Sequence, residues 1–208
     1  MSWSDLSGEA WGVYPEPRQV ALCEDYLNLL ERWNRAYNLT AIRDRPRMVT
    51  HHLLDSISVS AYLHGQRFLD VGTGAGLPGI PLAILNRDKE FVLLDSNGKK
   101  TRFLEQVCAH LELSNVRVIQ QRAEQLLDQR GFDMVLSRAF ASLTAMLRCT
   151  DHLLSPGGQW LAMKGVYPAE ELNNLPSGVI LQAVHSVAVP GLDAERHLVV
   201  MRRAINEQ

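Results

Sequence analysis

The chain has 208 residues, of which 46% are hydrophobic and 21% are charged, and its formal net charge at pH 7 is −2. This composition is ordinary for a globular protein with one core, and it excludes a generally basic nucleic-acid-binding protein, so an RNA contact would need a local basic patch. Cys23, Cys108 and Cys149 lie far apart without a C-x-x-C motif, which favours a reducing compartment. There is no secretion signal and no apolar run near the ~20 residues that span a bilayer, so we expect a cytoplasmic protein without a membrane partner.

Two amphipathic helices are predicted in the N-terminal part of the chain. Residues 17–37 repeat leucine and aromatic side chains at helical spacing, and Pro17 suits a first helical position. Residues 46–63 place an apolar side chain at every fourth position from Val49 to Ala61. We expect residues 1–63 to form a helical cap that packs on a domain of residues 64–208, the two making one compact unit. The first fifteen residues carry nothing diagnostic.

From Arg67 onward, predicted strands alternate with predicted helices. Strand patterns cover residues 67–72, 90–96, 116–122, 132–140 and 159–165; helical patterns cover 77–87, 98–113 and 142–154; "SPGG" at 155–158 is typical of a turn. The last two strands, 179–189 and 197–203, have no helix between them, which predicts an antiparallel pair at a sheet edge. The predicted fold class is α/β, with a seven-stranded, mostly parallel, doubly wound sheet and a helical cap.

The stretch "VGTGAGLPG" joins the first predicted strand to the next helix, where such sheets bind nucleotides. Glycines there permit positive φ and close approach of a ligand, and Asp95 ends the next strand at the spacing of a ribose-binding acid. The alternative for the loop is a tight turn that binds no ligand. The alternative for Asp95 is the N-cap of the following helix. Pro78 offers no N–H to a pyrophosphate, and the negative charge of Asp70 disfavours phosphate groups and favours a cationic amino-acid moiety. The pattern therefore favours S-adenosylmethionine over a dinucleotide.

Several segments together resemble the bacterial RsmG (GidB) family. They are "ERWNRAYNLTAIRD", "HHLLDS", "FLDVGTGAGLPGIPLAI", "LLDSNGKKTRFL", "SRAFASL", "LAMKG" and "ERHLVVMRR", and the similarity extends from about Glu31 to Arg203. The resemblance implies a class I (Rossmann-like) methyltransferase fold, S-adenosylmethionine as cofactor, and methylation of a guanine N7 in 16S ribosomal RNA. It implies cofactor contacts at Gly72, Leu77, Asp95, Ser96, Ala123, Glu124 and Arg138, and the glycine motif adds Gly74.

The residue pattern is compatible with attack by a guanine N7. This nitrogen has a lone pair and no proton to lose, so its methylation needs positioning more than a general base, and we assign no general base. "SRAF" stands where amine methyltransferases carry an Asn-Pro-Pro-Tyr motif, and no Pro-Cys nucleophile is present. Arg138 and Lys164, at predicted strand ends, are candidates for positioning the base, although Lys164 could equally be a solvated strand end. Phe140 could stack on the base, but packing in the following helix is the simpler expectation.

Basic residues gather in three segments, which predict a rim that grips RNA phosphates. They are the arginines between Glu31 and His52, the stretch "GKKTR" and the terminal "MRR"; a solvated face is the alternative. The RNA-binding candidates are Arg43, Lys99, Lys100, Lys164 and Arg196. His51 and His52 lack partners at metal-ligand spacing, so we expect no metal.

We expect a monomer that acts on 16S rRNA, within the small ribosomal subunit or its precursor, because the modest net charge suits a preformed ribonucleoprotein surface. Two other functions are compatible with parts of the pattern. One is an NAD(P)-dependent oxidoreductase on a similar sheet, and the other is a non-catalytic RNA-binding protein that keeps the cofactor fold.

Overall fold

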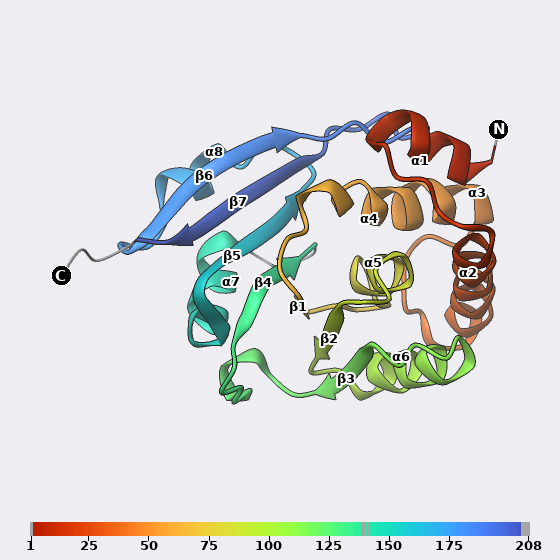
Figure 1. Ribbon diagram of the computed structural model, residues 1–208, viewed down its shortest axis with the longest axis horizontal. Coiled ribbons are helices and arrows are strands. Elements are labelled where there is room, and N and C mark those ends of the chain that lie inside the picture. Colours follow the sequence, from red (N-terminus) through yellow and green to blue (C-terminus); the bar gives the residue numbers. More distant parts are fainter. Residues whose placement is uncertain (1, 139, 141, 205–208) are drawn as a thin grey trace.

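The computed structural model describes residues 2–138, 140 and 142–204, and Figure 1 shows the arrangement of their elements. The N-terminal part contains α1 (Trp3–Trp11), α2 (Pro17–Tyr37), α3 (Arg45–Met48), the π-helix η1 (Val49–Leu54), α4 (Asp55–Ile57) and the 3₁₀-helix η2 (Ser60–Tyr62). The remainder contains β1 (Arg67–Val71), α5 (Gly79–Leu85), β2 (Glu90–Asp95), α6 (Gly98–His110), β3 (Val116–Gln120), η3 (Ala123–Gln125), β4 (Phe132–Ser137), α7 (Leu143–Thr150), η4 (Asp151–Leu153), β5 (Leu154–Lys164), α8 (Ala169–Asn173), β6 (Val179–Ser186) and β7 (His197–Arg203).

The seven strands form one sheet in the order β3-β2-β1-β4-β5-β7-β6. β1 to β5 pair in parallel, whereas β7 runs antiparallel to both β5 and β6. The predicted mostly parallel sheet with an antiparallel C-terminal edge pair is therefore confirmed. The prediction that the fifth strand begins after a turn at 155–158 is wrong, because β5 already starts at Leu154. Residues 155–158 lie within β5, where its pairing with β4 is irregular.

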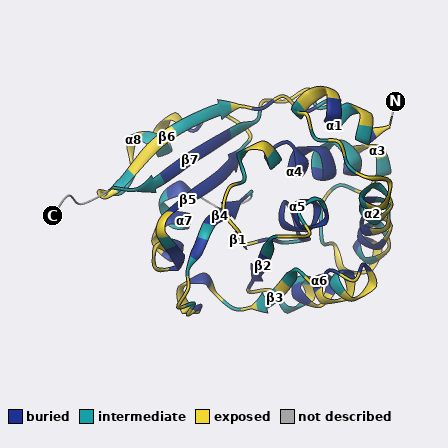
Figure 2. Ribbon diagram, in the orientation of Figure 1, coloured by how far each residue is buried: buried dark blue, intermediate teal, exposed yellow. Residues whose placement is uncertain are grey.

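Helices cover both faces of the sheet, so its central strands are buried (Figure 2). One face packs against α7 through a cluster that includes Leu69, Leu147 and Trp160. On the opposite face, the N-terminal helices share one hydrophobic cluster with α5 and α6. Tyr26 of α2 is fully buried there, and its hydroxyl donates to the Ala75 carbonyl at 2.8 Å. The cap is thereby attached directly to the glycine loop.

The segment predicted as one helix over 46–63 is helical but not a uniform α-helix. A π-turn occupies Val49–Leu54, and the Asp55 N–H reaches the Thr50 carbonyl five residues back. α4 ends at Ile57 and Ala61 belongs to the separate 3₁₀-helix η2, so the spacing of four does not continue to Ala61, which is exposed although Ile57 is buried. α1, in the part of the sequence that carried no diagnostic pattern, begins with a capping box between Ser2 and Asp5.

Among the described residues, none of the helices is both long enough and apolar enough to cross a membrane. The same residues contain no cluster of three or more His, Cys, Asp and Glu side chains that could hold a metal ion.

Candidate functional site

Two hollows lie at the carboxyl ends of the parallel strands, where ligands bind in open α/β sheets. The first, here called the loop hollow, is lined by Val71, Gly72, Leu94, Asp95, Ser96, Gln121, Arg122, Ala123, Glu124 and Phe140. The second, here called the arginine pocket, is lined by Ile42, His51, His52, Asp55, Arg138, Met163, Lys164, Gly165 and Arg196. The loop hollow lies over β1, β2 and the end of β3, and the arginine pocket lies between the cap and the ends of β4, β5 and β7.

The loop hollow brings together five of the eight residues predicted to contact the cofactor. These are Gly72, Asp95, Ser96, Ala123 and Glu124, which follow the ends of three neighbouring parallel strands. The carboxylates of Asp95 and Glu124 make the hollow rich in hydrogen-bond acceptors. Acceptors suit the hydroxyl and amino donors of a nucleoside, whereas they repel a pyrophosphate. These acceptors therefore fit the adenosine part of S-adenosylmethionine.

Asp95 also holds the glycine loop in place. Its Oδ2 accepts a hydrogen bond from the Gly74 N–H at 3.0 Å, and its Oδ1 accepts one from the Asn97 N–H at 2.9 Å. Lys100 adds a charged contact, with 3.4 Å between its Nζ and Oδ2. A carboxylate has about four acceptor positions and these contacts use three of them, so one position on Oδ1 remains for a ligand hydroxyl. Asp95 is thus able to orient the loop and accept a ligand hydroxyl at once, and its contact with Gly74 explains the place of that glycine next to the hollow.

Asp70 lies beneath the loop, fully buried, and lines neither hollow. Its Oδ2 accepts hydrogen bonds from the Thr73 hydroxyl at 2.7 Å and the Gly79 N–H at 2.8 Å, while its Oδ1 is buried without a partner. Burial raises the pKa of Asp70 to about 6, against the lowering effect of these hydrogen bonds. Asp70 therefore stabilises the shape of the loop from below. Its charge can act on a bound ligand only by long-range electrostatic interaction, without direct contact.

Leu77 lies on the other side of the loop from the hollow. Its side chain is buried in the cluster that α2 shares with α5 and α6. An apolar side chain at this position gains more from that core than from a polar hollow. The side chain of Leu77 is therefore not brought together with the other predicted cofactor residues.

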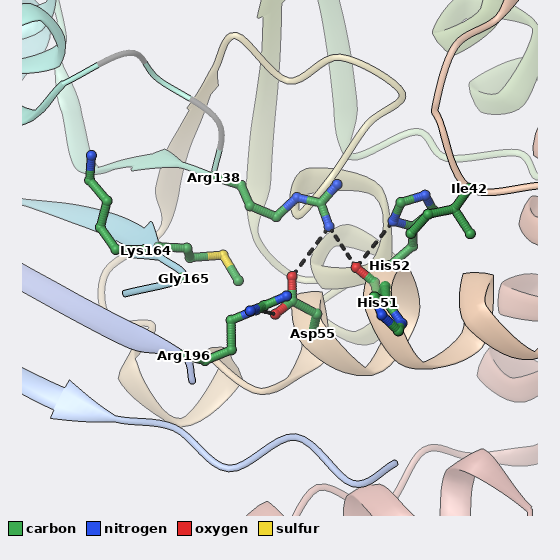
Figure 3. A pocket seen from close by; sticks show the side chains of 9 residues that line it. Ile42, His51, His52, Asp55, Arg138, Lys164, Gly165 and Arg196 are labelled. Carbon is green, nitrogen blue, oxygen red and sulfur yellow. Dashed lines mark hydrogen bonds and ion pairs between the residues drawn. The ribbon is translucent and has the colours of Figure 1, made fainter. Parts of the chain in front are cut away.

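The centre of the arginine pocket is Asp55, a buried carboxylate at the start of α4 (Figure 3). Its Oδ2 lies 3.3 Å from Nη1 of Arg138, which follows β4, and its Oδ1 lies 2.7 Å from Nε of Arg196, which precedes β7. The same Nη1 of Arg138 donates to the His51 carbonyl at 3.0 Å. One carboxylate thus holds two guanidinium groups from different strands against the cap.

His52 is neutral and fully engaged. Its Nε2 lies 2.8 Å from the Thr40 hydroxyl, and its Nδ1 lies 3.1 Å from the His51 carbonyl. Burial, with the nearby Arg138 charge acting in the same direction, lowers the pKa of His52 to about 4. Sequence reasoning considered the two histidines only as a metal pair and did not consider Asp55. The signal that could have found them is the segment "HHLLDS", whose polar residues the π-turn brings to the pocket.

Lys164 lies at the rim of the arginine pocket, and its ammonium points away from Arg138 (Figure 3). Its Nζ forms a salt bridge with Glu171 of α8, at 2.9 and 3.0 Å from the two carboxylate oxygens. Arg138 and Arg196 therefore meet at Asp55, whereas the charge of Lys164 is neutralised by Glu171 at the rim of the pocket.

Phe140 lines the loop hollow, where a Cβ added to Gly72 would come 3.6 Å from its ring. It precedes α7 and packs against the hydrophobic cluster that contains Leu143 and Leu147 of that helix, so the expected packing is confirmed although Phe140 lies outside the helix itself. The small size of Gly72 leaves room for this ring at the hollow. Ala139 and Ala141 of the segment "SRAFASL" lie outside the described residues.

The basic residues do not all surround one site. Lys100 contacts Asp95 at the loop hollow, whereas Arg43 donates to Asn38 at 2.6 Å and follows Ile42, which lines the arginine pocket. The prediction that "MRR" flanks the pocket is wrong. Because β7 runs antiparallel, its first residue pairs with Lys164 while Arg202 pairs with Gln159 near the opposite end of β5. Arg203 instead forms an ion pair with Asp151 at 2.8 Å.

Comparison with known families gives a match over most of the chain. The family model described as "rRNA small subunit methyltransferase G" (GidB) matches residues 19–199. Curated proteins called "Ribosomal RNA small subunit methyltransferase G" are similar along nearly their whole length. The one from Aeromonas hydrophila is 52% identical over 95% of this chain and 92% of its own. The one from Chromobacterium violaceum is 54% identical over 88% of each.

Solved structures with the same fold are more distant in sequence. A SAM-dependent methyltransferase from Aquifex aeolicus is 18% identical, with a TM-score of 0.58 over 76% of this chain and 94% of that one. The N-methyltransferase NodS from Bradyrhizobium japonicum is 13% identical, with a TM-score of 0.57 over 79% of this chain and 100% of that one. At these identities, the likeness concerns the fold.

Proposed function

Because the chain belongs to the GidB family, rRNA small subunit methyltransferase G, we propose that it transfers the methyl group of S-adenosylmethionine to N7 of a guanine in 16S ribosomal RNA. The family match across residues 19–199 is the observation that carries the proposal. It favours a methyltransferase over the two alternatives, the NAD(P)-dependent oxidoreductase and the non-catalytic RNA-binding protein.

The cofactor would be held at the loop hollow. S-adenosylmethionine supplies an electrophilic methyl group on its sulfonium. Asp95 and Ser96 would receive the ribose, Ala123 and Glu124 would frame the adenine, and Gly72 would allow close approach of the ligand. Gly74 would act through its hydrogen bond to Asp95, and Leu77 through the loop backbone, since its side chain is in the core. Arg138, which lines the arginine pocket, would lie near the methionine end of the cofactor.

The target base would be positioned by the arginine pocket. The two buried titratable side chains of this pocket are both engaged: Asp55 by two arginines, and His52 by Thr40 and the His51 carbonyl. Both are held in place by these partners. A guanine N7 releases no proton when it attacks, so its methylation needs a base that is positioned rather than a proton acceptor. A guanidinium donor such as Arg138 would hold the neighbouring O6 of the guanine, which leaves the N7 lone pair free to attack the methyl group.

The RNA strand would approach across the cap and the strand ends. Lys99 and Lys100 would meet phosphates near the loop hollow, and Arg43, Arg196 and Lys164 would do so at the arginine pocket. With a net charge of −2, the protein has little general attraction for free RNA. We therefore favour the small subunit or its precursor as substrate over protein-free rRNA.

The test uses methyl-labelled S-adenosylmethionine and small ribosomal subunits that lack the modification, with previously methylated subunits as the control. The rRNA is digested and the labelled nucleoside is identified. Label in 7-methylguanosine from the unmethylated subunits alone is the expected result. Label in another nucleoside would overturn N7 as the target. Cofactor binding in calorimetry without any transfer would overturn the proposed substrate.

A further inference from the structure

We propose that Tyr167, in the loop between β5 and α8, stacks on a nucleobase of the RNA next to the target guanine. The inference rests on the proposed function and adds a substrate-positioning residue to it. The loop starts at Lys164 and Gly165 on the rim of the arginine pocket and continues through Val166, Tyr167 and Pro168 to α8. It is the direct continuation of the strand end that borders the pocket.

The loop exposes two apolar side chains in succession. Val166 is 75% exposed and Tyr167 is 51% exposed. Single exposed apolar residues are common on protein surfaces, so exposure alone decides nothing. The position is what distinguishes Tyr167: its ring contacts His197 edge-on, with 5.6 Å between centroids. His197 follows Arg196 and pairs with Lys164 across the β5–β7 ladder.

The ring is therefore held while its exposed part remains available. The perpendicular contact with His197 holds the ring, and Tyr167 remains 51% exposed, so part of it stays open to a ligand. A planar base can stack on such a ring because every nucleobase has a π-face. A protein partner would be less compatible with the adjacent pocket, whose guanidinium groups, those of Arg138 and Arg196, attract an anionic strand.

The ion pairs around the arginine pocket make a stacking contact important for binding RNA there. Lys164 is paired with Glu171, and Asp55 is shared between Arg138 and Arg196. These pairings reduce, without removing, the attraction of the arginine pocket and its rim for phosphates. RNA that enters the arginine pocket then needs a contact that does not depend on charge, and Tyr167 supplies it beside the pocket.

The experiment compares Tyr167→Leu and Tyr167→Phe with the wild type. The control is Tyr14→Leu, because Tyr14 is the more exposed tyrosine, at 79%, and lies between α1 and α2. Binding of unmethylated small subunits is measured over a range of salt concentrations, together with KM and kcat for methyl transfer and the Kd for S-adenosylmethionine. Thermal unfolding establishes that each variant is folded.

Tyr167→Leu is expected to raise the Kd and KM for subunits about fivefold to 100-fold, the effect of losing one stacked base. Tyr167→Phe and Tyr14→Leu should stay near the wild type, and cofactor binding should be unchanged in all variants. Loss of stacking should also leave the slope of log K against log salt unchanged, whereas loss of a phosphate contact reduces it.

Unchanged subunit binding in a folded Tyr167→Leu variant would overturn the proposal. Loss of binding in Tyr167→Phe would do the same, because that change preserves the aromatic face. A wild type that binds subunits without methylating them would count against the proposed function, while the binding comparison would still decide the role of Tyr167.

Discussion

Asp55 and Arg138 lie 83 positions apart in the chain, yet Asp55 Oδ2 is 3.3 Å from Arg138 Nη1. The contact joins the N-terminal cap to the carboxyl end of β4. Asp55 holds Arg196 with its other oxygen, so one buried carboxylate fixes two arginines of the candidate substrate pocket. The residue therefore bears on both the stability of the fold and the shape of the pocket.

Replacement of Asp55 by Ala should lower the free energy of unfolding by about 3 kcal/mol, because it leaves two partly buried guanidinium groups without their counterion. Denaturant unfolding measures this change. Asp25→Ala, at an exposed aspartate on α2, is the matched control and should change stability by less than about 0.5 kcal/mol. Equal stability of the two variants would show that solvent compensates the arginines.

Arg138→Lys should reduce kcat/KM for small subunits about tenfold or more while the protein stays folded. Lysine keeps the charge but loses the planar guanidinium that contacts the His51 carbonyl and Asp55 and would donate to guanine O6. Steady-state methyl transfer measures the effect, and Arg148→Lys, on the exposed side of α7, is the control. A fully active Arg138→Lys variant would mean that only the charge at this position matters.

Asp95→Asn should weaken S-adenosylmethionine binding about tenfold, because it removes the charge from a carboxylate that holds the Gly74 and Asn97 amides. Calorimetry measures the Kd, with Asp88→Asn at an exposed turn as the control. KM for subunits should change little. An unchanged cofactor Kd would exclude Asp95 from the cofactor site.

Two glycines of the loop region should respond differently to alanine. A Cβ at Gly79 would lie 2.2 Å from Leu93 Cδ2 and 2.8 Å from Asp70 Oδ2, which predicts a loss of about 2 kcal/mol from overpacking. Gly74 has a φ of +63° but no atom within 3.5 Å of an added Cβ, so backbone strain of about 1 kcal/mol is expected. Denaturant unfolding of both variants tests this order, and the reverse order would contradict it.

His52 should make stability depend on pH. Its pKa is about 4 in the folded protein and near 6.5 in the unfolded chain, so below pH 6.5 the unfolded chain binds a proton that the folded protein does not. The stabilisation is complete above pH 6.5 and is lost as the pH falls toward 4. Between pH 7.5 and 5, the wild type should lose about 2 kcal/mol more than His52→Asn. Parallel stability curves for the two proteins would refute this assignment.

The order of strands and helices was predictable because it depends on local patterns. Buried parallel strands such as β2 are short apolar runs, and the helix of residues 17–37 follows a regular apolar spacing that the structure reproduces at both ends. The glycine loop and Asp95 could be placed at one sheet edge because parallel strands end at the same side. These features, with the family resemblance, indicate a methyltransferase from the sequence alone.

Only the tertiary structure decided which charges meet. Asp55, Arg138 and Arg196 come from the cap, β4 and the start of β7, and no spacing in the sequence relates them. The direction of β7 moved Arg203 away from the pocket, and a core position took the side chain of Leu77 out of the hollow. Local patterns specify periodicity and turn chemistry, whereas ion pairs between distant segments depend on how whole elements pack, which the sequence encodes only through the complete fold.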